Sequence, residues 1–257
     1  MSSAIIIENL NFSYPSQNGA YDLPVLSNFN LEISKGEFFS IVGLSGCGKS
    51  SLLKIIGGLN QYNSGKILVG NNSPKKAMRG RKFGFVFQNP VLLDWRTAIG
   101  NVKLPSEVFH ETISDEKAVE LLNKVGLKGF EFSYPKQLSG GMQSRVAIAR
   151  VLSYDPEFLL MDEPFGDLDE ITKEQLHAEL LKLWQETGMT IIFVTHNISE
   201  AVLLSDRVAI MSKKPSKIKK IYNIDLSRPR NSETKKNRQY YELIDHIKND
   251  LKQEFLV

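Results

Sequence analysis

Apolar and polar positions near the N-terminus of this chain fall into short patterns that predict strands. Ala4–Glu8 is an apolar run rich in isoleucine, and Leu26–Ile33 alternates apolar with polar residues, as a half-buried antiparallel strand does. Phe38–Val42 is apolar except at Ser40, and a glycine follows it at once. This pattern is typical of a buried strand that runs into a loop, so we expect a central strand there.

Helical spacing follows this strand and then alternates with further apolar runs. Ser50–Gly57 and Thr172–Glu186 are predicted helices. Further strands are predicted at Lys66–Val69, Phe83–Phe87, Phe158–Met161, Thr190–Val194 and Arg207–Met211. The alternation predicts an α/β fold, with a mostly parallel sheet covered on both sides and an antiparallel part at the N-terminus.

The pattern turns helical between Pro90 and Asp155. Ser114 is a candidate N-cap, and an apolar face follows it and ends at Gly126; its members are Ala118, Leu121, Leu122 and Val125. Gln143–Leu152 predicts a second helix. We therefore expect a core of residues 1–89 and 156–225, an inserted helical subdomain at 90–155, and a tail at 226–257 that holds an amphipathic helix from Asn231 onward.

Composition and charge narrow the function classes. The chain has 257 residues and a net charge of +3, which is too near balance to indicate a nucleic-acid partner. Its single cysteine excludes an internal disulfide. The N-terminus shows no secretion signal, and no stretch approaches the roughly 18 apolar residues of a membrane span. If the protein serves a membrane process, we expect another chain to supply the membrane part.

A glycine-rich loop that ends in Lys-Ser lies between a predicted strand and a predicted helix. Its residues are Gly43, Leu44, Ser45, Gly46, Cys47, Gly48, Lys49 and Ser50, followed by Ser51. Backbone N–H groups of such a loop and the helix N-terminus wrap a phosphate, Lys49 adds a charge, and Ser50 offers a hydroxyl to Mg²⁺. The alternative is a glycine-rich turn. Cys47 is either a reactive thiol or a small residue that fits the loop.

Adjacent acids end the Phe158–Met161 run. Asp162 lies at the tip of this predicted buried strand, where its carboxylate can hold Mg²⁺ through water, and Glu163 can polarise an attacking water. The alternative is a pair of solvated loop acids.

A second anion site is predicted at Ser139, Gly140 and Gly141, before the Gln143–Leu152 helix. Ser139 is a good N-cap, and the glycines leave N–H groups uncovered. One nucleotide per chain does not need two such sites, but a dimer in which each chain completes the other's site does. Alone, the segment also fits a plain N-cap with flexible glycines.

With these motifs in this order, residues 4–230 resemble the ATP-binding subunit of an ABC transporter. The resemblance implies a P-loop NTPase (RecA-like) fold that binds ATP and Mg²⁺. It implies that Leu138–Gln143 is the signature motif acting in trans, that Gln88 contacts Mg²⁺ or water, and that His196 faces the γ-phosphate. It also places Tyr14 on adenine and Asp169 in the D-loop. From the residues alone, a histidine placed as His196 is more often structural, and Tyr14 fits surface packing equally well.

Weaker features resemble the nitrate, sulfonate and taurine importer ATPases, whose related subunits also serve thiamine precursors and other small organic solutes. They are Leu92–Thr97, the methionine of Ser-Gly-Gly-Met-Gln, and Leu226–Arg230. Asp94, Ser144 and Asp167 depart from the family pattern. A basic run at Lys213, Lys214, Lys217, Lys219 and Lys220 predicts a solvated edge or a weak attraction to anionic lipid.

The resemblance therefore implies the ATPase subunit of an importer at the cytoplasmic face of the bacterial inner membrane. Its expected partners are a second copy of the chain, an integral-membrane permease and, indirectly, a solute-binding protein. Alternatives are a soluble ABC ATPase of translation or DNA repair, and a P-loop kinase that would not need the Ser-Gly-Gly segment.

Overall fold

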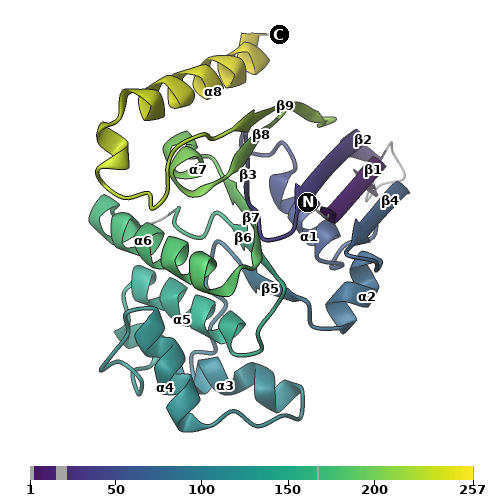
Figure 1. Cartoon of the computed structure of the whole chain (residues 1–257). Coiled ribbons are helices and arrows are strands. Elements are labelled where there is room, and N and C mark those ends of the chain that lie inside the picture. Colours follow the sequence, from purple (N-terminus) through teal and green to yellow (C-terminus); the bar gives the residue numbers. More distant parts are fainter. Residues whose placement is uncertain (1–2, 16–21, 167, 257) are drawn as a thin grey trace.

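A sheet of six strands forms the centre of the molecule (Figure 1). The computed structural model describes residues 3–15, 22–166 and 168–256. The strands lie in the order β5 (Phe83–Val86), β6 (Phe158–Asp162), β7 (Thr190–Thr195), β3 (Phe38–Gly43), β8 (Arg207–Met211) and β9 (Ile218–Asn223). All pairs are parallel except β8–β9. The predicted mostly parallel α/β sheet is confirmed.

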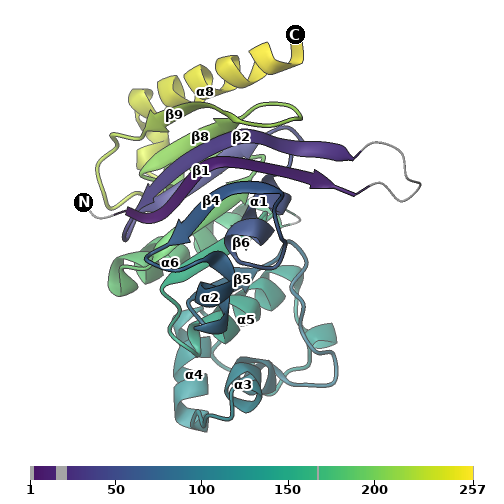
Figure 2. The same ribbon diagram turned by 90° about the vertical axis from the view of Figure 1, so that its right-hand side faces the viewer.

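A second, antiparallel sheet packs beside the first (Figure 2). It places β1 (Ser3–Tyr14) between β2 (Leu23–Ser34) and β4 (Ser64–Val69). Buried and exposed residues alternate along β2, because one face of this sheet meets the core and the other meets solvent. This sheet is the predicted antiparallel N-terminal part.

Helices cover both faces of the central sheet (Figure 1). In chain order they are α1 (Lys49–Ile56), α2 (Pro74–Arg79), α3 (Ala98–Val108), α4 (Asp115–Lys124), α5 (Gly140–Leu152), α6 (Glu170–Thr187), α7 (Ile198–Leu204) and α8 (Arg238–Leu256). None of the helices in the described ranges combines the length and the apolar character needed to cross a bilayer.

The central strand β3 is buried along its whole length. Phe39 and Ile41 belong to the apolar cluster that contains β1, β2 and α1, whereas Phe38 packs with α5 and α6 and Val42 with α7 and α8. A parallel strand covered on both faces needs apolar residues at every position, which explains the continuous run in the sequence.

The region from Pro90 to Asp155 is helical, as predicted. The Ser114 side chain caps α4 by accepting from the Lys117 N–H, and the predicted apolar face of α4 is buried. The prediction for α5 was wrong at its start, because the helix begins at Gly140 rather than Gln143. The strong Ser139 cap outweighs the poor helix propensity of the glycines that follow.

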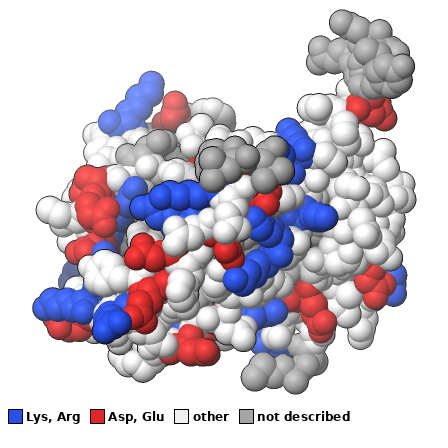
Figure 3. All heavy atoms as spheres, turned by 90° about the horizontal axis from the view of Figure 1, so that it is seen from above, with Lys and Arg blue, Asp and Glu red and all other residues white. Residues whose placement is uncertain are grey.

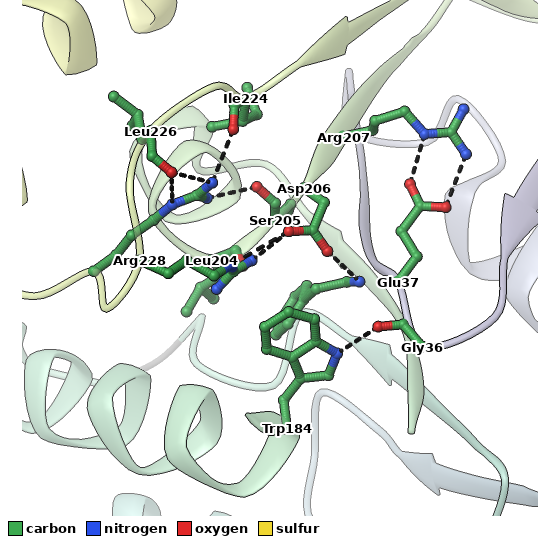
Figure 4. Close-up of polar contacts among 12 residues, drawn as sticks. Gly36, Glu37, Trp184, Leu204, Ser205, Asp206, Arg207, Ile224, Leu226 and Arg228 are labelled. Atoms are coloured by element: carbon green, nitrogen blue, oxygen red, sulfur yellow. Dashed lines mark hydrogen bonds and ion pairs between the residues drawn. The ribbon is translucent and has the colours of Figure 1, made fainter. Parts of the chain in front are cut away.

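The C-terminal tail is fastened to the core by arginines. Arg228 bonds to Asp206 and to the carbonyl of Leu204 and lies 4.1 Å from the Trp184 ring, whose indole N–H donates to Gly36 (Figure 4). Arg230 is buried and donates to backbone carbonyls of residues 202–226. Helix α8 starts at Arg238 rather than at residue 231, because a 3₁₀ turn, Thr234–Lys236, precedes it.

The basic run lies on and before β9, an edge strand that sequence patterns did not predict. Lys219 pairs with Glu254 at 2.9 Å and Lys220 with Asp250 at 2.8 Å, both across to α8. Basic and acidic side chains lie next to one another over this face (Figure 3). Because acidic side chains of α8 pair with part of the basic run, the attraction of the run to anionic lipid is weaker than its number of lysines suggests.

Candidate functional site

The glycine-rich loop lies at the carboxyl end of β3 and leads into α1. Gly46 and Gly48 adopt φ values of 75° and 112°, which side chains with a Cβ rarely tolerate. Lys49 begins α1 and is 5% exposed; its ammonium donates to the carbonyls of Gly43 at 3.0 Å and Leu44 at 3.1 Å. The loop therefore encloses a buried cation beside a helix N-terminus.

Asp162 ends β6 directly opposite the start of α1. Ser50 Oγ donates to Asp162 Oδ1 at 2.9 Å. Burial, together with the charge of Glu163, raises the pKa of the Asp162 carboxyl, although the Ser50 hydrogen bond opposes the shift. A buried acid with a raised pKa gains from a cation, so this pair is suited to a hard metal ion.

Glu163 connects Lys49 with His196. Its backbone adopts a φ of 46°, and its N–H donates to the Val194 carbonyl of β7 at 2.9 Å. One carboxylate oxygen lies 3.8 Å from Lys49 Nζ and the other 2.8 Å from His196 Nδ1. A non-glycine residue in this left-handed conformation is uncommon and is often found at functional sites.

Lys49, Ser50 and Glu163 line one open pocket of about 330 Å³, whereas Asp162 and His196 lie outside its lining. Its lining consists of Ser45, Gly46, Gly48, Lys49, Ser50, Ser51, Gln88, Glu163 and Lys214. Tyr14 is 39% exposed and its hydroxyl lies 3.0 Å from Ser51 Oγ, at the edge of the loop. Cys47 is buried, and burial raises the pKa of its thiol, which favours a small residue that fits the loop over a reactive thiol.

The second predicted anion segment lies elsewhere. Ser139 caps α5 by accepting from the Met142 N–H at 3.3 Å, and a Cβ on Gly141 would meet Thr172 Cγ2 at 2.6 Å. Asp169 caps α6 through Thr172 N–H at 2.9 Å. Within the described residues, the lining of the 330 Å³ pocket includes none of Ser139, Gly140, Gly141 and Asp169. Asp167 lies outside the residues that the structure describes.

Lys214 is a site residue that sequence reasoning missed. It lies in the predicted basic run, yet it lines the 330 Å³ pocket at the glycine-rich loop. The hydroxyl of nearby Ser216 donates to the Cys47 carbonyl, and the Ser216 N–H bonds to Val25 at 2.8 Å, which fixes this segment against the loop. The lysine-rich sequence indicated a charged segment, but it did not indicate that Lys214 lies near the glycine-rich loop.

The residues present fit a magnesium nucleotide. No group of three or more His, Cys, Asp or Glu side chains in the described ranges could hold a metal ion by itself. Mg²⁺ in phosphate sites needs less than that, because it keeps waters and takes oxygens from the phosphates. The hydroxyl of Ser50, the carboxylate of Asp162 and the amide of Gln88 are oxygen ligands of this kind beside the phosphate loop.

Comparisons with known proteins agree with this geometry. Residues 26–166 match the family described as ABC transporter. The chain is 43% identical over 227 residues to the aliphatic sulfonates import ATP-binding protein SsuB of Bacillus thuringiensis subsp. konkukian, with 88% of each chain covered. It is 40% identical over 245 residues to the bicarbonate transport ATP-binding protein CmpD of Synechocystis, with 93% of this chain and 86% of CmpD covered.

A solved structure is similar as well. The dimeric post-hydrolysis structure of the ATP-binding cassette MJ0796, bound to ADP and Pi, has a TM-score of 0.77 at 34% identity and covers 87% of this chain and 100% of that chain. The P-loop ATPase fold that the resemblance implied is therefore confirmed. On the family match and these identities, the chain belongs to the ABC transporter family and is one of its ATP-binding cassettes.

Proposed function

We propose that this protein is the ATPase subunit of an importer that carries a small solute through a separate permease. The observation that carries the proposal is the arrangement around Glu163, whose carboxylate bridges Lys49 of the phosphate loop and His196 at the end of β7. The relatives named for sulfonate and bicarbonate transport support import of a small anion.

Each residue of the proposed site has a distinct role in the proposed hydrolysis. Lys49 and the loop N–H groups bind the β- and γ-phosphates, while Tyr14 stacks on adenine. Mg²⁺, held by Ser50, Asp162 and Gln88, would neutralise phosphate charge. Glu163 accepts a proton from the attacking water, and His196 donates to the γ-phosphate. Catalysis of this kind depends on positioning and charge stabilisation.

The signature segment acts on the nucleotide of a second copy. Ser139, Gly140 and Gly141 lie outside the pocket of their own chain, so they are available to close the pocket of a partner. Asp169 would lie at the same dimer interface. The dimeric MJ0796 structures support the pairing of two such cassettes.

Closure of the dimer would then pull on an integral-membrane permease at the cytoplasmic face of the inner membrane. The inserted helical subdomain, which contains the exposed Trp95, and the Gln88 region form the proposed docking surface for that permease. A solute-binding protein would deliver the solute from the other side.

Glu163→Gln tests the proposal. The amide keeps the size of the side chain but cannot accept the proton, so we expect ATP binding to persist while kcat falls by about 10²–10⁴-fold. The variant should elute as a dimer with ATP and as a monomer without it. Glu157→Gln, at the opposite end of β6, is the control and should behave as wild type. A Glu163→Gln protein that hydrolyses ATP normally, or stays monomeric with ATP, would refute the assignment.

A further inference from the structure

A buried polar pair lies behind the turn that carries His196. His177 of α6 is 4% exposed and Glu200 of α7 is 6% exposed. His177 Nε2 lies 3.7 Å from Glu200 Oε1, and neither ring nitrogen of His177 makes a hydrogen bond within the described part of the chain. Burying polar groups with so few partners costs free energy, so a core position here would favour an apolar residue.

Glu200 is connected to the His196 turn through Thr195. The Thr195 hydroxyl donates to Glu200 Oε2 at 3.0 Å and accepts from the Asn197 N–H at 2.9 Å. These bonds hold the residues on both sides of His196. Burial raises the pKa of the Glu200 carboxyl, but His177 and Thr195 outweigh this effect and leave that pKa below its usual value. The ionised carboxylate is a strong acceptor for Thr195.

His177 also contacts the segment that follows Glu163. Its ring lies 5.3 Å from the Phe165 ring in an edge-to-face arrangement, and Phe165 packs at 5.8 Å on Phe193 of β7. The same imidazole therefore contacts the segment that carries Glu163 and, through Glu200, the turn that carries His196.

We propose that His177 and Glu200 are positioning residues that hold His196 against Glu163. Neither lines the phosphate pocket, so they act only through Thr195 and Phe165. The His196 side chain is 62% exposed, so its own packing does not fix its position, and the 2.8 Å contact with Glu163 depends on the turn beneath it. The inference rests on the proposed role of His196 in hydrolysis.

His177→Leu and His177→Gln separate positioning from packing. Leucine fills the space but cannot pair with Glu200, whereas the glutamine amide can donate to it. For the full-length leucine variant we expect kcat to fall at least about tenfold, because misplacing a catalytic group by about 1 Å costs up to a hundredfold. KM for ATP should stay unchanged, since Lys49 and Ser50 are untouched. Glutamine should recover most of kcat.

Histidine side-chain ¹H–¹⁵N spectra provide a readout that does not depend on turnover. The chain has four histidines, so His196 can be followed beside His110 and His246. The leucine variant should shift the His196 resonances alone. Glu200→Gln keeps the volume of the side chain and should shift them too, which covers the case in which His177→Leu fails to fold. His246→Gln, on exposed α8, should change neither kcat nor the His196 signals.

The outcomes distinguish this inference from the proposed function. Folded His177→Leu and Glu200→Gln proteins with wild-type kcat and unshifted His196 resonances would overturn the positioning role. A His196→Ala protein with wild-type turnover would instead overturn the role proposed for His196 itself.

Discussion

At the scale of single residues, the site combines the buried ammonium of Lys49 with the exposed ammonium of Lys214. Lys49 is almost fully buried and bonds to the carbonyls of its own loop, whereas Lys214 is exposed at the mouth of the pocket. A buried cation binds phosphate strongly because water does not screen it. An exposed cation contributes a smaller attraction that falls with salt.

Lys214→Ala should raise the Kd for ATP by about two- to fivefold at low salt, as expected for the loss of an exposed ion pair worth about 1 kcal/mol or less. The difference from wild type should shrink as salt increases. Lys213→Ala removes the same charge one residue earlier, outside the pocket lining, and is the matched control. Equal affinities for the two variants in an ATP titration would exclude Lys214 from the site.

At the scale of elements, α8 is attached to α7, the helix that follows His196. Tyr240 is 3% exposed and its hydroxyl donates to the Ser199 carbonyl of α7 at 3.1 Å. Ile247 is fully buried in the same apolar cluster, which also contains Val202 and Leu203. The C-terminal tail thus covers α7 and stabilises this helix, which directly follows the turn that carries His196.

Tyr240→Phe should lower the stability of the docked tail by about 1 kcal/mol, because a buried hydrogen bond is lost. Burial raises the pKa of Tyr240 to about 12, from an ordinary value of 10.0. A group whose pKa is higher in the folded than in the unfolded state stabilises the fold while it is protonated. The contribution of Tyr240 to the free energy of unfolding is therefore present up to about pH 10 and is lost as pH rises toward 12. The protection factors of the α8 amides, which correct for base-catalysed intrinsic exchange, should therefore fall above pH 10 in wild type and less so in Tyr240→Phe.

Tyr241→Phe is the control for this measurement. Tyr241 is the adjacent residue, but it is 57% exposed. It should show the wild-type response to alkali. If both variants respond alike, Tyr240 does not hold the tail.

At the scale of the whole molecule, one chain contains the pocket at its glycine-rich loop and, outside the lining of that pocket, the proposed signature segment Ser139–Gly141. Ser139→Arg places a long cation at that segment. Nucleotide binding by the monomer should stay intact because the pocket is unchanged, while ATP hydrolysis should fall to background because the dimer cannot close.

Ser114→Arg is a closely matched control for that experiment. Ser114 caps α4 with the geometry that Ser139 has on α5, accepting a backbone N–H at 3.2 Å against 3.3 Å. Both changes lose a cap worth about 1 kcal/mol, so any general loss of stability should be shared. Only the Ser139 variant should lose hydrolysis; equal activities would remove the signature segment from the mechanism.

The sequence by itself determined whatever is encoded by neighbouring residues. The phosphate loop, the Asp162–Glu163 pair and the Ser139 cap are contiguous motifs, and the strand and helix periods are local, so each could be predicted without knowing what packs against it. The start of α5 was mispredicted because glycine propensity is a weak signal beside a good cap.

Only the tertiary structure decided which distant residues meet. Lys214 reaches the phosphate loop through the fold of the segment after β8, and His177 meets Glu200 and Phe165 because α6, α7 and the segment after β6 pack together. Edge strand β9 forms by pairing with β8. Its lysines are paired with acidic side chains of α8, which lie about thirty residues away in the sequence. Such contacts depend on burial and long-range pairing, which leave no periodic mark in one sequence.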